Sequence, residues 1–405
     1  MLSPMPFVLI PCRTQKPLPD MRVAFYAPMK PPDHPVPSGD RHLARLFLAA
    51  LRHAGHTPEL ISRFVSRDGQ GDPARQLRLQ SLGDQLAIRL IRQLRARPLE
   101  TRPQAWMTYH LYHKTPDWLG PRIADTFNIP YVIAEASSAP KQAGRNWDIG
   151  YQGANAAISR ADAILTLNSD DWDCLQPVAR EPVLHRRLLP FVDASIYDGP
   201  MSRRANLREA HAKRGGWPPD TVLLLAVGMM RAGAKESSYT QLAEALQQVP
   251  GDNWRLLVAG DGPRRTAISQ ALETAIPGRI SFLGAQEPPE LAETYAASDM
   301  LVWPAVDEAF GIALLEAQAA GLPVVASKQR GVPDIVASGV TGRLPAPDNI
   351  EAFAKAVGSL IEDPETRARM GAAAARRVRE QYDVPVAAER LDATLKTVAM
   401  VVRST

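Results

Sequence analysis

The stretch Glu308-Ala-Phe-Gly-Ile-Ala-Leu-Leu-Glu316 lies between a strand-like run, Met300-Leu-Val-Trp303, and an alanine-rich segment that ends at Gly321-Leu-Pro323. A short apolar run followed by proline is typical of a buried strand, and Gly-Leu-Pro is typical of a helix end. The sequence therefore predicts a strand, a loop and a helix in this order. Glu308 is then expected in the loop and Glu316 within the helix.

The start of this helix has the chemistry of an anion site. We expect Phe310, Gly311 and Ile312 to begin the helix, and the first amides of a helix have no internal partner and carry partial positive charge. Gly311 would let a phosphate approach the backbone closely. A carboxylate on each side can accept hydrogen bonds from sugar hydroxyls, so the stretch predicts a nucleotide-sugar site. Taken alone, two glutamates near one helix would be an ordinary surface feature.

From residue 21 onward, strand-like and helix-like segments alternate, which is typical of parallel α/β layers. The expected strands are Val23–Tyr26, Glu59–Ser62, Ala105–Tyr109, Tyr131–Ala134 and Ala163–Leu167 in a first unit, and Val222–Val227, Arg255–Ala259, Ile280–Leu283, Met300–Trp303 and Val324–Ala326 in a second. Two α/β domains of similar size with a cleft between them are the simplest architecture. Residues 1–20 are rich in proline, and we expect them to be an extraneous or disordered tail.

Composition narrows the class of protein. A chain of 405 residues with 45% hydrophobic residues can bury the cores of two or three domains. Its net charge of +4 is small for this length, so general nucleic-acid binding is not expected. The only two cysteines are Cys12 and Cys174, which excludes a disulfide scaffold and fits a reducing, cytoplasmic compartment. No stretch approaches the ~20 apolar residues of a membrane span.

The stretch from Glu308 to Glu316 resembles the C-terminal half of GT-B-fold retaining glycosyltransferases of family 4. Other motifs of that family follow in the family's order: Val258-Ala-Gly-Asp-Gly-Pro263, Ile280-Ser-Phe-Leu-Gly284, Tyr295-Ala-Ala-Ser-Asp299, Gly321-Leu-Pro-Val-Val-Ala326 and Gly339-Val-Thr-Gly342. The resemblance is strong over residues 220–383 and moderate over 21–195.

The resemblance implies the GT-B architecture, in which two Rossmann-like α/β domains face a central cleft. It implies an acceptor-side domain at 21–195 and a domain that binds the nucleotide-sugar donor at 196–384. Residues 385–405 would form a C-terminal helix that crosses back to the first domain.

The resemblance also implies the donor contacts. Glu316 would bind the ribose hydroxyls, and Glu308 would contact the donor sugar. In the turn Gly228-Met-Met-Arg-Ala-Gly-Ala-Lys235, Lys235 stands where the family has its diphosphate-binding lysine. The usual arginine position holds Met229, so we expect Arg231 to reach the phosphate by another path. For both cations the alternative is an ordinary solvated loop charge.

Two further turns correspond to donor-binding segments of the family. Gly260 and Asp261 lie in the turn at a strand end, and Ser38-Gly39-Asp40 corresponds to the glycine-rich loop of the first domain. The backbone amides around Gly39 would face the diphosphate across the cleft. The alternative is a plain loop before a helix, with Ser38 as its N-cap.

The acceptor side is less clearly marked. The family often places a histidine after the strand that corresponds to Tyr131–Ala134, whereas this chain has Glu135 there. Either Glu135 or His110 could orient the acceptor hydroxyl, or each could be a core or cleft-wall residue. A metal site at His110 and His113 would need further ligands, and none is evident.

No cofactor or metal is expected. The third glycine of a dinucleotide fingerprint after Gly260-Asp-Gly262 would fall at Arg265, so a nicotinamide cofactor is unexpected. The chain has no Walker sequence and no Asp-x-Asp pair in a donor-loop context. The resemblance implies a metal-independent mechanism, with the nucleotide sugar as co-substrate.

The resemblance implies a retaining hexosyltransferase that moves a hexose from a nucleoside diphosphate sugar to a hydroxyl acceptor in cell-envelope or polysaccharide biosynthesis. The acceptor would be a glycan, a lipid-linked molecule or a small molecule. One alternative is another GT-B-fold nucleotide-sugar enzyme, either an epimerase or an inverting transferase. The other is a non-catalytic nucleotide-sugar-binding protein.

Residues 74–103 form a basic segment that bears on the acceptor. The segment carries seven arginines against Asp84 and Glu100, and leucines and isoleucines interleave with them at helical spacing. A basic amphipathic helix can lie on an anionic membrane surface, which predicts peripheral contact with the inner face of the membrane. The alternative is a packed helix with a solvated arginine face.

Overall fold

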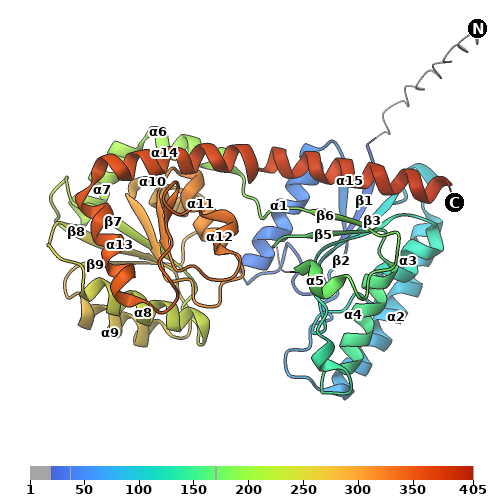
Figure 1. Ribbon diagram of the computed structural model, residues 1–405. Coiled ribbons are helices and arrows are strands. Elements are labelled where there is room, and N and C mark those ends of the chain that lie inside the picture. Colours follow the sequence, from blue (N-terminus) through green and yellow to red (C-terminus); the bar gives the residue numbers. More distant parts are fainter. Residues whose placement is uncertain (1–19, 37, 169–170, 405) are drawn as a thin grey trace, which may run out of the picture.

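The computed structural model describes residues 20–36, 38–168 and 171–404. The predicted tail lies outside the described residues, apart from Asp20. The chain forms two α/β units side by side, and two consecutive C-terminal helices run along them, α14 (Pro364–Gln381) on the second unit and α15 (Val384–Ser404) on the first (Figure 1).

The first unit is built on a six-stranded parallel sheet with the strand order β2-β1-β3-β4-β5-β6. Its apolar strands are buried because helices cover both faces, as is usual for parallel sheets. The strands are β1 (Arg22–Tyr26), β2 (Thr57–Ser62), β3 (Ala105–Leu111), β4 (Tyr131–Ala136), β5 (Ala163–Thr166) and β6 (Leu184–Arg187). The helices are α1 (Gly39–His53), α2 (Pro73–Ala96), α3 (Gly120–Phe127), α4 (Asp148–Arg160) and α5 (Asp171–Leu175).

The second unit repeats this plan, with the strand order β12-β11-β10-β7-β8-β9. Its strands are β7 (Val222–Val227), β8 (Trp254–Ala259), β9 (Ile280–Gly284), β10 (Met300–Trp303), β11 (Val324–Ala326) and β12 (Gly342–Arg343). Its helices are α8 (Ala234–Gln247), α9 (Arg265–Ala275), α10 (Pro288–Ala297), α11 (Ile312–Ala319), α12 (Val332–Ile335), α13 (Ile350–Glu362) and α14 (Pro364–Gln381). The prediction of two parallel α/β units is confirmed.

Two crossings join the units. Short helices α6 (Asp198–Ser202) and α7 (Arg204–Gly215) lead from the first sheet to the second. Helix α15 (Val384–Ser404) returns and packs on α1, and its Leu391 and Leu395 lie in the core cluster of the first unit with Phe47. The crossings are hydrogen-bonded to each other, because Val192 N donates to Tyr382 O at 2.8 Å and Val384 N donates to Val192 O at 3.0 Å. The domain boundaries at 195 and 384 stay predictions.

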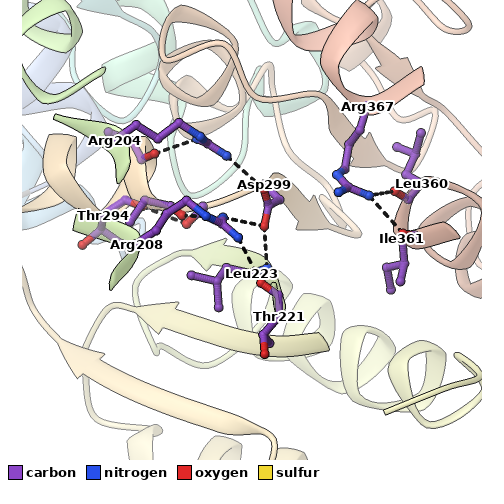
Figure 2. Close-up of polar contacts among 12 residues, drawn as sticks. Arg204, Arg208, Thr221, Leu223, Thr294, Asp299, Leu360, Ile361 and Arg367 are labelled. Carbon is purple, nitrogen blue, oxygen red and sulfur yellow. Dashed lines mark hydrogen bonds and ion pairs between the residues drawn. The ribbon is translucent and has the colours of Figure 1, made fainter. Parts of the chain in front are cut away.

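A partly buried charge cluster fixes α7 to the second sheet (Figure 2). Asp299, which precedes β10, accepts hydrogen bonds from Arg204 at 2.9 Å, from Arg208 at 2.7 Å and from the Leu223 amide at 2.8 Å. The two arginines also donate to carbonyls of Ala296 and Ala297 at the C-terminus of α10. Cations stabilise the negative end of a helix dipole. The cluster thus joins α7, α10 and β7 at the amino end of the sheet, opposite to the carboxyl-end loops described below.

Within the described part of the chain, no helix combines the length and the apolar character that crossing a bilayer requires. Helix α2 contains most of the basic segment 74–103. Its buried side includes Ala87, Ile91 and Leu94, while Leu77, Leu82 and Ile88 are exposed together with the arginines.

Candidate functional site

The loops at the carboxyl ends of the two sheets face each other. His42, in α1 of the first unit, lies with its Nε2 atom 3.4 Å from Glu316 Oε1 in α11 of the second. Phe310, in the loop before α11, is 9% exposed and belongs to the core cluster of the first unit. Ligands of open α/β sheets bind at the carboxyl ends of the strands, so a molecule held here would touch both units.

Helix α11 begins two residues later than Phe310, the start that the sequence predicts. Ile312 is its first residue, and Gly311 is the N-cap with φ of 75°. A left-handed φ is easy for glycine and costly for other residues, so Gly311 sets the sharp entry to the helix. Phe310 is therefore an anchor between the units, and the amides that begin at Ile312 are the ones at the helix N-terminus.

Glu308 and Lys235 lie against each other at this helix start. Lys235, in the first turn of α8, donates a hydrogen bond to Glu308 Oε2, and both side chains are about four-fifths buried. The ammonium group also lies 5.2 Å from the centre of the Trp303 ring. The structure thus brings together the two residues that the sequence predicts for the donor sugar and the diphosphate.

Glu316 lies one turn into α11 and is 13% exposed. The Tyr295 hydroxyl donates to its Oε2 at 2.9 Å, and His42 approaches its Oε1. The carboxylate is thus held in one orientation, with one oxygen facing the first unit. His42 and Tyr295 were not among the predicted site residues, and only the cross-domain packing reveals His42.

The turns after β7 and β8 pack on each other. A Cβ atom at Gly260 would come within 1.9 Å of Gly228 O, and one at Gly262 within 2.4 Å of Met230 O. The two glycines are therefore required by close backbone contact. The Asp261 carboxylate pairs with Arg265 of α9 at 3.3 Å, so the structure places it in a surface ion pair and not against Glu308 or Lys235.

Arg231 is exposed in this turn and lies near Lys30 of the first unit. Burial lowers the pKa of Lys30, and the neighbouring cations Arg41, Arg231 and Arg67 lower it further, whereas Asp40 opposes them. Cations from both units thus gather at this point. Lys30 was not predicted as a site residue, because a single lysine in a proline-rich loop carries no motif.

Gly39 is the first residue of α1, and Ser38 is its N-cap, which accepts a hydrogen bond from the Arg41 amide at 3.2 Å. Nothing lies within 4 Å of a Cβ built on Gly39. The capping interpretation of Ser38 is confirmed, and the open space at Gly39 leaves the predicted approach of a phosphate sterically free.

His110 and Glu135 lie near the ends of the neighbouring strands β3 and β4, and their side chains lie close to each other. His110 Nδ1 lies 3.1 Å from Asp40 Oδ1 and 3.8 Å from Glu135 Oε2. His110 has φ of 63° and Glu135 has φ of 59°. Left-handed residues other than glycine are uncommon and cluster at functional sites. The sequence predicted both residues but not Asp40, because only the fold brings Asp40 next to His110.

The charges of this group perturb one another. Burial alone would lower the pKa of His110, but Glu135 and the contact with Asp40 raise it to about 9. Burial raises the pKa of Glu135, although His110 opposes the shift. Burial, together with Glu135, raises the pKa of Asp171 at the start of α5 to about 6. His110 is therefore a cation at neutral pH, surrounded by three carboxyl groups.

Over residues 20–36, 38–168 and 171–404, no three His, Cys, Asp or Glu side chains form a group that could hold a metal ion. Metal independence stays a prediction, since it concerns the reaction and not this geometry.

Sequence comparison shows which known proteins the second unit is similar to. Residues 208–377 match the family model described as Glycosyl transferases group 1. The chain is 32% identical to a D-inositol 3-phosphate glycosyltransferase of Corynebacterium glutamicum over 222 residues, which are 53% of this chain and 52% of that protein. It is 34% identical to the sulfoquinovosyl transferase SQD2 of Arabidopsis thaliana over 183 residues, covering 44% of this chain and 34% of that one. The chain thus spans about half the length of the first of these relatives.

Structural comparison covers both units. The sucrose-phosphate synthase of Thermosynechococcus elongatus aligns with a TM-score of 0.71 at 19% identity, over 94% of this chain and 100% of that one. Anabaena HepE in complex with UDP aligns with a TM-score of 0.69 at 17% identity, over 93% of this chain and 100% of that one. The fold is the two-domain GT-B architecture, as the sequence predicts.

Proposed function

We propose that this protein is a retaining glycosyltransferase that moves a hexose from a nucleoside diphosphate sugar to a hydroxyl group. The observation that carries the proposal is the grouping of Lys235, Glu308 and Glu316 around the N-terminus of α11, within the segment that matches group 1 glycosyl transferases. This grouping offers a cation from α8, and helix amides and two carboxylates from α11 and the loop before it.

Each group would act on a different part of the donor. The amides from Ile312 onward, with Lys235 and Arg231, would neutralise the diphosphate. Glu316 would accept hydrogen bonds from the ribose hydroxyls, and Glu308 would accept them from the donor sugar. These cations and amides supply the charge that a metal ion would otherwise bring, so we propose that turnover needs no metal.

The reaction would proceed on one face of the sugar. The bond between the anomeric carbon and the β-phosphate oxygen breaks, and the acceptor oxygen forms its bond to the same carbon from the same side. The acceptor's proton passes to the departing phosphate oxygen, so charge and atoms balance without a covalent enzyme intermediate. Interactions with the phosphate that strengthen as its negative charge develops lower the barrier.

UDP-hexoses are the donors to try first. HepE, which shares the fold, was solved with UDP and with UDP-glucose. We further propose a role in cell-envelope or polysaccharide biosynthesis, with the exposed arginines of α2 making peripheral contact with an anionic membrane.

One observation favours a second candidate, a non-catalytic nucleotide-sugar binder. Met229, 39% exposed, occupies the place of the expected arginine, and Lys235 is already paired with Glu308. A binder would keep its UDP-sugar intact, whereas a transferase slowly hydrolyses a bound donor when no acceptor is present.

Donor binding and turnover test the proposal separately. A nucleotide sugar at 100 times its dissociation constant should add about 2.7 kcal/mol of stability, which a thermal-shift series over UDP-, GDP- and ADP-sugars detects. Glu316→Ala should weaken UDP binding by roughly 1.5–3 kcal/mol, because a charged acceptor of ribose hydrogen bonds is lost. Glu365→Ala, an exposed glutamate in α14, is the matched control. Unchanged UDP affinity in Glu316→Ala by calorimetry would remove Glu316 from the ribose role.

A further inference from the structure

The group that we call the acidic quartet consists of Asp40, His110, Glu135 and Asp171. It draws on four elements, because Asp40 lies in the first turn of α1, His110 and Glu135 end β3 and β4, and Asp171 begins α5. When the carboxyl groups are ionised and the imidazole is protonated, the quartet has three negative charges and one positive charge.

The quartet faces the donor side. Asp40 lies two residues before His42, whose ring contacts Glu316 of the donor helix. Asp171 interacts electrostatically with Arg330, which follows β11 of the second unit. An acceptor held by the first unit against the proposed donor site would therefore lie beside this group of side chains.

The quartet also has unused hydrogen-bonding capacity. Glu135 Oε2 and His110 Nδ1 are shielded from solvent, yet neither has a well-aligned hydrogen-bond partner among the described residues. Nδ1 has only the ion-pair contacts with Asp40 and Glu135. A buried carboxylate oxygen without a donor is costly, and hydroxyl groups of a ligand would supply that donor.

We propose that the acidic quartet binds the acceptor, and that the reactive end of the acceptor is an uncharged polyhydroxylated ring. Asp40 and Asp171 are then specificity-determining residues, and this inference rests on the proposed function. Hydroxyl groups donate to the carboxylates, whereas a phosphate offers only acceptors and negative charge to this part of the site. Like charges placed together in an interface are strongly disfavoured.

Cations near the quartet limit the region in which an uncharged ligand is preferred. Lys30 lies near Asp40, and Arg67 lies near Tyr112, whose ring is 5.3 Å from the His110 ring. Arg330 lies near Asp171. Because these cations surround the quartet, the exclusion concerns only the ring that enters it and not the rest of the acceptor.

The test compares matched ligands on the full chain saturated with UDP. Saturation-transfer NMR measures the relative affinity of myo-inositol against inositol 3-phosphate, and of glucose against glucose 6-phosphate, at tens of millimolar ligand. Wild type should prefer the uncharged member of a pair by about tenfold or more. The double variant Asp40→Asn with Asp171→Asn should lose most of that preference, whereas Asp173→Asn, an exposed residue of α5, should keep it.

Three outcomes would overturn the inference: the phosphorylated member binds equally well or better, neither member of any pair binds, or the double variant keeps the wild-type preference. UDP binding is the separate readout in every sample. If wild type does not bind UDP or a UDP-sugar, the proposed function fails first; if it binds UDP and one of the three outcomes is seen, only the acceptor assignment fails. Retained UDP binding also shows that the double variant is folded.

Discussion

Replacing Asp40 by asparagine removes the carboxylate whose oxygen lies 3.1 Å from His110 Nδ1. This carboxylate and Glu135 overcome the effect of burial and raise the pKa of His110 to about 9. We therefore expect the pKa of His110 in Asp40→Asn to fall from about 9 towards the ordinary value of 6.5, with Glu135 keeping it from falling the whole way.

The shift also affects stability, with a definite sign. A histidine whose pKa is raised by folding stabilises the protein fully below the unfolded value of 6.5. That contribution is lost as the pH rises to about 9. At ~1.36 kcal/mol per pKa unit, the separation corresponds to about 3 kcal/mol. Asp171, with its pKa of about 6, is almost fully ionised above pH 7, so the window from pH 7 to 9.5 reports mainly on His110.

Histidine-selective NMR measures the pKa directly. The chain has eight histidines, and the signal that disappears in His110→Gln identifies the one of interest. Urea unfolding of the first unit at pH 7 and pH 9.5 then measures the linked stability. Wild type should lose about 2 kcal/mol more than His110→Gln between these pH values, because part of the full contribution is already lost at pH 7. The comparison uses the pH-dependence of each variant, so a constant loss of packing in His110→Gln cancels.

Two results would refute this reasoning. A wild-type His110 signal that titrates at or below pH 6.5 would mean that burial dominates and that His110 is neutral at physiological pH. An unshifted pKa in Asp40→Asn would mean that Glu135 alone keeps His110 charged, and Asp40 would then have no part in fixing its protonation state.

Two further predictions concern the scaffold and the surface. Asp299→Ala should cost the second unit about 3 kcal/mol of unfolding free energy in urea, the lower end of the range for buried pairs, because the partly buried Arg204 and Arg208 lose their shared carboxylate. Asp198→Ala, which breaks the exposed pair with Arg379, should cost less than about 1 kcal/mol, and equal losses would show that the Asp299 cluster does not stabilise the unit. Changing Arg89, Arg92 and Arg95 to Gln should weaken binding to anionic liposomes at low salt about a hundredfold, at roughly 1 kcal/mol per arginine, with UDP binding intact; a wild-type protein that ignores such liposomes would exclude the membrane role of α2.

The strands could be predicted from the sequence where they are apolar and central. Runs such as Val222–Val227 are buried on both faces and are found where expected. Strand β6 (Leu184–Arg187) was missed because it lies at the edge of its sheet and has the sequence Leu-His-Arg-Arg, which lacks an apolar run. Strand β12 has two residues and carries no periodicity at all.

The site could be predicted only where its residues share one stretch of chain. Glu308, Gly311 and Glu316 follow one another closely, so their spacing carried the information. Asp40 and His110 are brought together by the neighbouring strands β1 and β3, and their sequence separation of seventy residues hides the contact. His42 and Glu316 meet across the two units, and no local pattern marks such a pair. Asp261 is the opposite case, in which a recognisable motif did not reveal what the side chain contacts. The glycines of its motif are required for a backbone turn, while its carboxylate pairs with Arg265 at the surface.

The charged side chains around the start of α11 already have partners, and this limits what the proposed donor can gain by binding there. Lys235 is paired with Glu308, and Glu316 is held by Tyr295 and His42. A diphosphate that draws Lys235 towards itself would break that pair and free the Glu308 carboxylate to accept hydrogen bonds from the donor sugar. The diphosphate and the sugar of the donor would then bind cooperatively, because the phosphate frees the carboxylate that accepts hydrogen bonds from the sugar. A free sugar, which cannot displace Lys235, would meet a neutralised carboxylate and bind weakly, and the site would discriminate nucleotide sugars from sugars by an exchange of ion pairs and not by shape alone.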